Sequence, residues 1–469
     1  MARTARIFCV STARGAAMLA AALDAGLFEP SDRRLLLIAD TAANPETAPS
    51  VAVVPGFARV RERFDEVRSW NETVSPFHPS GWTPRPDDVP LWERHLRLLW
   101  GLGEDEVHLA VESVHGNPSS ALCQMFTGAP VDVYADDLLS YGPSPDKLDP
   151  LIGTRVGRLL HLDLVPGLAP LLLTEFGVPA VPVPWEAFLK VVGELADAEE
   201  DLPEPAERPA LLLGQCGRDA EAEAEQQLRM VRGAVALGHR TLVLAPHPAA
   251  FARRFRPLED EASRLGAELT VLERPVLAEV AFQRLRPALV VGCSSPALLT
   301  AAVLYGLPVA RAGTGAALAG LTPYGNAERV PLTVVDALLP DLEDPAGAAD
   351  PADPADTAGW SPPSRERVRE LGALLRAVGF AMQPRIHSEL REEAERYLSA
   401  HPGRHISRYF TRRRLASLAL PGGLPTGLAS LPRNPTVRRL ARRARALRGR
   451  RFPLTRIRTR LPLQGRPPG

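Results

Sequence analysis

The sequence predicts an α/β protein built from two doubly wound parallel sheets. Short apolar runs typical of buried strands alternate with helical stretches in residues 1–193, stop at an acidic, proline-rich stretch at 194–209, and resume at residue 210. Strands that alternate with helices favour parallel sheets, because each crossover helix covers one face of its sheet. Polar motifs follow three of the apolar runs, at the ends where open α/β sheets bind ligands.

Four apolar runs predict strands in the amino-terminal half. Ser11 and Thr12 follow the first run and can cap the alanine-rich helix after it. The stretch 194–209 is then predicted to be a linker, because acid and proline dominate it. The predicted strands are Arg6–Val10, Leu35–Ala39, Val107–Val111 and Val131–Tyr134.

The alternation restarts in a second predicted domain, residues 210–338. A low-complexity Asp-Pro-Ala stretch at 339–363 predicts a disordered linker, and 364–400 again has a helical pattern. Two Rossmann-type domains with a central cleft and a helical carboxyl-terminal segment make a GT-B-like architecture. The predicted strands are Ala210–Leu213, Thr241–Leu244 and Ala288–Val291, and the predicted helices are Ala220–Leu237 and Ala297–Tyr305.

The charge is balanced overall but concentrated at one end. The 469 residues carry 55 basic and 55 acidic side chains, yet 401–469 holds 18 arginines and no acid. We predict a disordered basic tail here. Apolar residues at helical spacing in 437–447 suit peripheral contact with an anionic membrane, and a plain solvated tail is the alternative. No nucleic-acid partner is expected, because few aromatic residues are interleaved with the arginines.

Cysteine usage and hydropathy indicate a cytoplasmic protein. Cys9, Cys123, Cys216 and Cys293 are far apart and form no CxxC motif, so they are interpreted as buried thiols in a reducing compartment. No apolar run approaches the roughly 20 residues of a membrane-spanning helix.

The first motif is His247-Pro248, directly after the predicted strand Thr241–Leu244. An imidazole at that strand end can donate to a phosphate oxygen and stabilise a departing nucleotide. Pro248 would stop the strand from continuing. The alternative is an incidental loop histidine.

The second motif is Ser294-Ser295, between the strand ending at Val291 and the helix starting at Ala297. Hydroxyl groups and free backbone amides at a helix amino terminus form an anion site. The alternative is an ordinary helix cap without a ligand.

The third motif is Asp136-Asp137, after the strand Val131–Tyr134. A carboxylate there can act as general base on an acceptor hydroxyl. A metal-binding pair and a solvated turn are the alternatives. No further carboxylate or histidine stands at ligand spacing, so we expect no metal.

Taken in order, the three motifs resemble the bacterial alpha-2,8-polysialyltransferase family of GT-B fold. That family has an acidic motif ending in glycine, a His-Pro motif and a paired-serine motif. The resemblance spans about residues 5–325 and also includes Ile7–Leu23, Glu112–Pro118 and Leu211–Gln215. It therefore adds Gly214 and Gln215 to His247, Pro248, Ser294 and Ser295 as donor-binding residues.

The resemblance implies an inverting, metal-independent transfer of sialic acid from CMP-sialic acid to a glycan acceptor, with no cofactor. Asp136, helped by Asp137, would be the base, His247 the phosphate ligand or acid, and the two serines phosphate donors. One departure stands out. Counting back from Ser140-Tyr141, the expected first acid falls on Ala135 and the expected glycine on Asp137. Either Asp136 has taken over as base or the reaction is lost.

Two other functions remain open from the sequence. Polymerases that use CDP-glycerol share the frame and two of the motifs, but usually need a second catalytic histidine in the amino-terminal half. A non-catalytic GT-B-like protein would explain Ala135 and Asp137. The histidines available for the first alternative are His78, His95, His108, His115 and His161.

Overall fold

The computed structural model describes residues 3–46, 48–215, 220–247, 255–274, 276–344, 362–401 and 403–423. Several predictions fall wholly or mostly outside these ranges: those for Cys216, Pro248, the disordered linker at 339–363, and the basic tail at 401–469 with its amphipathic stretch at 437–447.

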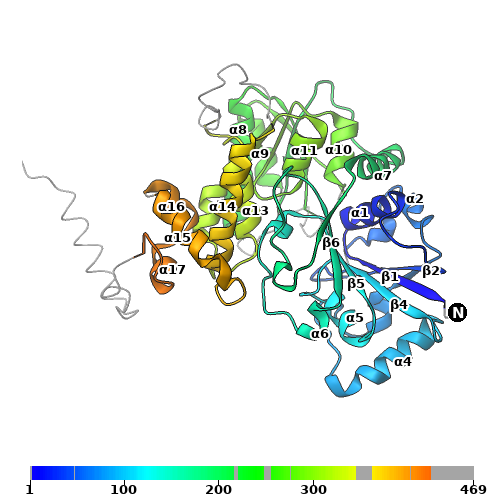
Figure 1. Cartoon of the computed structure of the whole chain (residues 1–469). Helices are drawn as coiled ribbons and strands as arrows, with labels where there is room; N and C mark the ends of the chain where they lie inside the picture. The colour runs from blue at the N-terminus through cyan, green and yellow to red at the C-terminus, as the bar shows by residue number, and fades with distance from the viewer. Residues whose placement is uncertain are drawn as a thin grey trace, which may run out of the picture. The chain divides into compact units, whose positions relative to one another are not determined.

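The amino-terminal half holds a seven-stranded parallel sheet in the order β3-β2-β1-β4-β5-β6-β7 (Figure 1). All four predicted strands are confirmed. Three strands were not predicted. The edge strands β3 and β7 are short and half exposed, and so carry no continuous apolar run. The apolar run of the interior strand β6 is interrupted by Gly157, Arg158 and His161. The strands are β1 (Thr4–Val10), β2 (Arg33–Ile38), β3 (Glu66–Ser69), β4 (Glu106–Val111), β5 (Val131–Ala135), β6 (Val156–Leu162) and β7 (Ala180–Val183).

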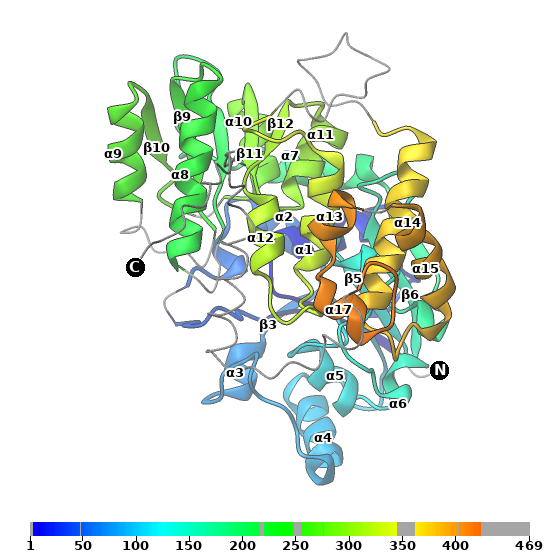
Figure 2. The same cartoon turned by 90° about the vertical axis from the view of Figure 1, so that its left-hand side faces the viewer.

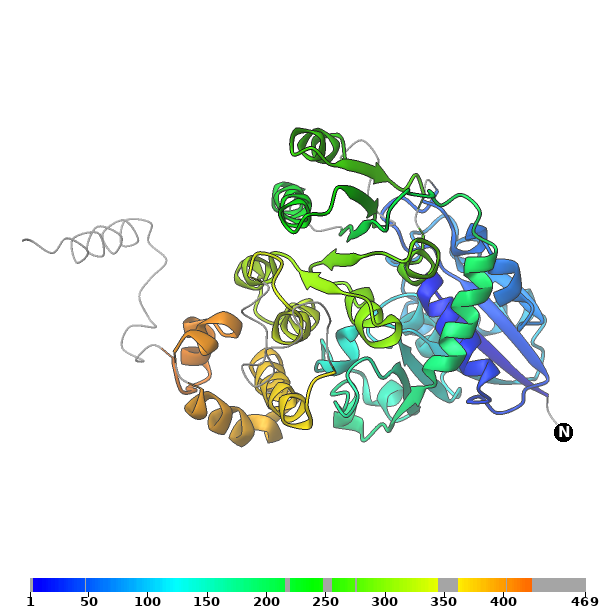
Figure 3. The same ribbon diagram turned by 90° about the horizontal axis from the view of Figure 1, so that it is seen from above.

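Helices cover both faces of this sheet. In β1, Phe8 and Val10 pack on the side of helices α1 (Ala13–Asp24) and α7 (Trp185–Asp197), whereas Ile7 and Cys9 pack on the opposite side. This is the two-residue alternation of a strand buried on both faces. Figure 3 shows α7 lying along α1. Because α7 ends at Asp197, it includes the first residues of the predicted linker.

The remaining elements of this half are short helices at the strand ends and one longer amphipathic helix. They are η1 (Val51–Val53), α2 (Phe57–Arg61), α3 (Trp70–Val74), η2 (Pro86–Asp88), α4 (Val89–Leu99), α5 (Ser119–Met125), η3 (Leu138–Tyr141), α6 (Pro150–Gly153) and η4 (Thr174–Phe176).

The second half holds a five-stranded parallel sheet in the order β10-β9-β8-β11-β12, flanked by helices such as α8 and α9 (Figure 2). The three predicted strands are confirmed, and the two short edge strands were not predicted. The strands are β8 (Ala210–Leu213), β9 (Thr241–Ala245), β10 (Glu268–Val271), β11 (Leu289–Gly292) and β12 (Val309–Arg311); the helices are α8 (Ala220–Ala236), α9 (Arg256–Arg264), α10 (Ala278–Leu285), α11 (Ala297–Tyr305), α12 (Thr314–Gly320) and α13 (Arg329–Leu338). Two parallel α/β sheets with a helical carboxyl-terminal part make the GT-B-like fold that the sequence predicts.

The helical prediction for 364–400 is confirmed as α14 (Arg365–Met382), η7 (Ser388–Leu390) and α15 (Arg391–Ala400), and α14 contacts α13. The prediction that a tail starts at residue 401 is wrong for residues 403–423. These form α16 (Arg404–Tyr409) and α17 (Arg412–Ser417), with Tyr409, Phe410 and Leu415 buried. Because arginine dominates this segment of the sequence, its few apolar residues were not recognised as buried ones.

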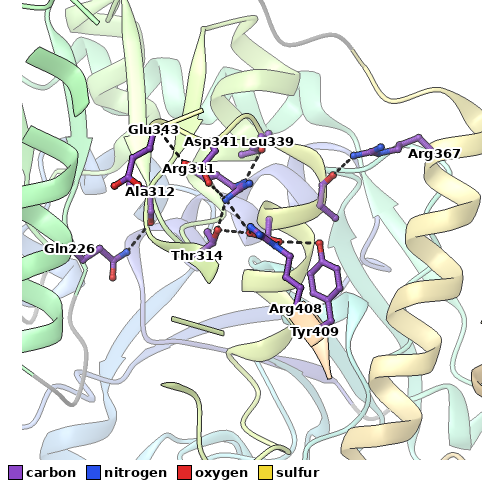
Figure 4. A network of polar contacts seen from close by, with 12 residues as sticks. Gln226, Arg311, Ala312, Thr314, Leu339, Asp341, Glu343, Arg367, Arg408 and Tyr409 are labelled. Carbon is purple, nitrogen blue, oxygen red and sulfur yellow. Dashed lines mark hydrogen bonds and ion pairs between the residues drawn. The ribbon is translucent and has the colours of Figure 1, made fainter. Parts of the chain in front are cut away.

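A buried carboxylate holds α16 against the second half. Asp336 of α13 accepts hydrogen bonds from Thr314 Oγ1 at 2.5 Å and from Tyr409 Oη at 3.0 Å, and it is ion-paired with Arg311 and Arg408. Figure 4 shows these side chains converging from β12, α12 and α16. Through Asp336 the carboxyl-terminal helices are tied to the turn between β12 and α12.

Candidate functional site

Three neighbouring strands of the first sheet place polar residues at one edge. Ser11 and Thr12 follow β1, Glu112 follows β4, and Asp136 and Asp137 follow β5. Because the three strands are parallel and adjacent, their carboxyl ends meet at the same edge of the sheet. The predicted acidic pair therefore has a third carboxylate beside it.

The two residues that follow β1, Ser11 and Thr12, contact the Glu112 carboxylate. Its carboxylate accepts hydrogen bonds from the Ser11 amide at 3.2 Å and from the Ser11 hydroxyl. Thr12 Oγ1 lies 3.0 Å from Asp136 Oδ2 and 3.5 Å from Glu112 Oε1. Helix α1 passes close to Glu112 at Gly15, where a Cβ atom would lie 2.9 Å from Glu112 Oε1 and would displace this carboxylate. Glu112 and Asp136 are thus neighbours across Thr12.

Burial and the negative charge of Asp136 raise the pKa values of two carboxyl groups in this cluster, those of Glu112 and Asp137. Burial, followed by the charge of Asp136, raises the pKa of Glu112 to about 7, against the opposing hydrogen bonds from Ser11 and Thr12. The same two causes raise the pKa of Asp137 to about 7. Asp137 also accepts the Leu139 amide at 2.8 Å and so caps η3, whereas the Asp136 carboxylate meets the Thr12 hydroxyl. The cluster can exchange a proton near neutral pH, as a general base must.

Arg14 of α1 connects this edge to the second half. Its Nε donates to the backbone oxygen of Asp136 at 2.6 Å, and its Nη2 donates to Thr300 Oγ1 of α11 at 3.0 Å. Its Nη1 forms an ion pair with Glu279 of α10. The Arg14 side chain therefore contacts both the carboxyl end of β5 and two helices of the second half, α10 and α11.

In the second half, Gly214 and His247 stand at the ends of the adjacent strands β8 and β9. The Gly214 amide donates to the Ala245 carbonyl at 2.8 Å. The His247 side chain is exposed, but desolvation lowers the pKa of its imidazole, with the charge of Glu223 opposing. The lowered pKa keeps His247 neutral at pH 7, when one ring nitrogen carries a hydrogen that it can donate.

The paired serines stand next to these residues, at the end of β11. Gln215 Nε2 donates to Ser294 Oγ at 3.2 Å, and Gln226 Nε2 lies 3.4 Å from Gln215 Oε1. Ser295 Oγ accepts a hydrogen bond at 3.3 Å from the amide of Ala297, the first residue of α11. The structure thus brings Gly214, Gln215 and Ser294 together at one edge of the second sheet.

The sequence missed four residues of this site: Thr12, Arg14, Glu112 and Gln226. Arg14 left a usable signal, because a lone arginine in an alanine-rich, buried helix needs a partner for its charge. From the sequence, Thr12 was recognisable as a helix cap but not as a site residue. Glu112 belonged to a stretch that resembles the family, but no role was predicted for it. Nothing in the sequence pointed to Gln226.

Two further observations bear on the site. Among the described residues, no group of three or more histidine, cysteine, aspartate or glutamate side chains could hold a metal ion. No helix in the described ranges is long and apolar enough to cross a membrane.

Solved structures similar to this chain have low sequence identity and low TM-scores. A putative UDP-N-acetylglucosamine 2-epimerase from Listeria monocytogenes is 13% identical, with 82% of this chain and 98% of that chain covered and a TM-score of 0.38. MurG from Acinetobacter baumannii is 10% identical, with 84% and 95% covered and a TM-score of 0.37. The Escherichia coli heptosyltransferase WaaC is 14% identical, with 66% and 88% covered and a TM-score of 0.29.

No curated protein matches the chain. A family model does: the alpha-2,8-polysialyltransferase model matches residues 6–314, which is more than half of the chain. The matched stretch runs from β1 to the start of α12 and includes the acidic edge, the His-Pro motif and the paired serines. The chain therefore belongs to the alpha-2,8-polysialyltransferase family and is a glycosyltransferase of the sialyltransferase type.

Proposed function

We propose that the protein transfers sialic acid from CMP-sialic acid to a hydroxyl group of a glycan by inverting displacement. The observation that carries this proposal is the Arg14 connection, which ties the acidic edge of the first sheet to the helix that follows the paired serines of the second. A base on one side and phosphate-binding groups on the other are what such a displacement needs.

In the proposed reaction the acceptor oxygen forms a bond to the anomeric carbon of the donor. The bond from that carbon to the phosphate oxygen breaks, and CMP leaves with the electron pair. The acceptor proton passes to Asp136. Ala135, at the place where the family has its first acid, is the last residue of β5 and is buried, whereas Asp136 is the first carboxylate beyond the strand. This position supports Asp136 as base.

The donor phosphate would bind at the second sheet. Neutral His247 can donate one hydrogen bond to a phosphate oxygen, and the hydroxyl groups of Ser294 and Ser295 supply others. Gln215 holds Ser294 in place at 3.2 Å, and Gly214 lets the chain before His247 pass close by. Pro248 belongs to this proposed set by family resemblance.

Binding of CMP tests the donor assignment. A ligand that binds only the folded state raises the melting temperature, by about 2.7 kcal/mol of stabilisation at a hundredfold excess over Kd. We expect CMP to raise the melting temperature, and His247→Ala to remove that rise. His239→Ala is the matched control, because His239 precedes β9 at the opposite end of the strand and the pKa of His239 is also lowered by burial.

The transfer assay then offers CMP-sialic acid and CDP-glycerol separately, with a glycan acceptor, and weighs the products by mass spectrometry. A product larger by one or more sialic acid residues supports the proposal. A product formed only from CDP-glycerol, or no melting shift with millimolar CMP, overturns it.

A further inference from the structure

We propose that Arg14 is a positioning residue that sets the place of Asp136 relative to the donor-binding half. The proposal rests on the proposed transfer reaction and adds to it a residue outside the three motifs.

The guanidinium group of Arg14 reaches its three partners in three directions. Nε donates to the Asp136 carbonyl, Nη1 pairs with Glu279, and Nη2 donates to Thr300 Oγ1. A planar fork with five donors can do this at once, whereas a lysine ammonium on a flexible stem cannot hold three fixed directions.

The contact is buried, which makes it costly to lose. Arg14 is 9% exposed and Glu279 is fully buried, with its second oxygen, Oε2, lacking a partner among the described residues. The Arg14 guanidinium also lies 5.7 Å from the ring centroid of Phe188 in α7. A buried carboxylate without its arginine is strongly unfavourable, so the two halves are held together at this point.

On the donor side, the contact leads to the paired serines. Thr300 accepts the hydrogen bond from Arg14 and donates its own hydroxyl hydrogen to the Pro296 carbonyl at 3.2 Å. Pro296 directly follows Ser294 and Ser295. A shift of Arg14 therefore reaches the serine turn through two hydrogen bonds.

On the acceptor side, the first turn of α1 holds Asp136 at two atoms. Arg14 binds its backbone oxygen at 2.6 Å, and Thr12 Oγ1 lies 3.0 Å from its carboxylate. Without Arg14, the carboxylate keeps its chemistry but loses its fixed place opposite the donor. A displacement of about 1 Å at such a point can cost about a hundredfold in rate.

The test compares Arg14→Met and Arg14→Lys with Arg6→Met. Arg6 is also a buried arginine, paired with Asp132 at 2.8 Å, but this pair lies within the first half. The readout is the ratio of sialic acid transferred to CMP-sialic acid hydrolysed by water, together with the CMP-induced melting shift.

We expect Arg14→Met to keep the melting shift but to lower the transfer-to-hydrolysis ratio at least about tenfold, because a bound glycan hydroxyl must be aligned with both Asp136 and the donor carbon, whereas a small water molecule can adjust its position. Arg14→Lys should fall between Arg14→Met and the unmutated protein. Arg6→Met should lower stability and leave the ratio unchanged. A ratio in Arg14→Met equal to that of the unmutated protein overturns the proposal, even if stability falls.

A second measurement does not depend on turnover. Spin labels at Leu98→Cys and Leu237→Cys, two exposed positions in different halves, report the distance between the halves. Every variant also carries Cys216→Ser, whereas Cys9, Cys123 and Cys293 are buried and are kept. We expect a broader distance distribution in Arg14→Met than in Arg6→Met. If the unmutated protein transfers no sialic acid, the proposed function fails, and this distribution alone decides the role of Arg14. An unchanged distribution overturns that role.

Discussion

Gly214 and His247 approach each other so closely that no side chain fits between them. A Cβ atom on Gly214 would lie 3.0 Å from the backbone nitrogen of His247 and 2.9 Å from the Ala245 carbonyl oxygen. The neighbours are backbone atoms, which cannot turn aside as a flexible side chain can. The glycine at the end of β8 therefore determines the path by which the chain enters the His-Pro motif.

We predict that Gly214→Ala weakens CMP binding by moving His247, and that overpacking destabilises the fold by about 1–3 kcal/mol. Gly128→Ala is the control, since a Cβ atom on Gly128 would meet nothing within 4 Å. Calorimetric titration with CMP and thermal melting measure the two effects. Unchanged CMP affinity in Gly214→Ala would show that the position of His247 does not matter for the donor.

The two aspartates of the acidic motif should respond differently to loss of charge. We predict that Asp136→Asn retains the CMP-induced melting shift but lowers transfer by about a hundredfold to ten-thousandfold, the usual contribution of a general base. Asp137→Asn should be milder, because an asparagine oxygen can still accept the Leu139 amide. Initial rates of sialic acid transfer measure both variants. Full activity in Asp136→Asn would place the base elsewhere.

The raised pKa of Glu112 predicts a dependence of stability on pH. Its pKa is about 7 in the folded protein, against 4.5 as the ordinary value. Below pH 4.5 both states hold the proton, and the stabilising contribution is fully present. Between pH 4.5 and about 7 only the unfolded state releases the proton, so this contribution is lost as the pH rises.

Glu112→Gln should remove that dependence while keeping the shape of the side chain. The measurement is the melting temperature of the unmutated protein minus that of Glu112→Gln, followed from pH 4.5 to pH 7.5. We expect the difference to fall across this range and then level off. A difference that rises or stays constant would mean that the pKa of Glu112 is not raised.

The folded part of the arginine-rich end should contribute to stability. Ending the chain at Ala400 removes Arg408 and Tyr409, two partners of the buried Asp336. Burial raises the pKa of Asp336, but hydrogen bonds from Arg408 and Thr314 and the charge of Arg311 outweigh burial and hold this pKa below its ordinary value. We predict a loss of about 3–5 kcal/mol on losing these partners. A chain ending at Gly423 is the control and should melt as the full chain does.

The same two chain lengths test membrane contact. Thirteen of the 18 arginines after residue 400 lie beyond Gly423, and each basic residue near an anionic surface contributes about 1 kcal/mol. We predict that the full chain floats with vesicles containing anionic lipid at low salt but not at high salt, and that the chain ending at Gly423 does not float. Equal recovery of both chains would refute the membrane contact.

By itself, the sequence determined the class of the fold and the polar motifs. A buried parallel strand needs a continuous apolar run, and a polar residue after such a run lies at the ligand-binding edge of the sheet. The runs before Asp136, His247 and Ser294 were therefore recognisable without a structure. Edge strands such as β3 and β10 were not, because half-exposed strands need no such run. The interior strand β6 was not recognised either, because Gly157, Arg158 and His161 interrupt its apolar run.

Only the tertiary structure decided which residues from distant parts of the chain meet. Thr12 and Asp136 are 124 positions apart, and Arg14 and Thr300 are 286 apart. No spacing rule links such pairs, since their contact results from strand order and from the packing of α1 against the second half. The burial that raises the pKa of Glu112, and the burial of Tyr409 and Leu415 in an arginine-rich segment, likewise depend on neighbours that the local sequence does not specify.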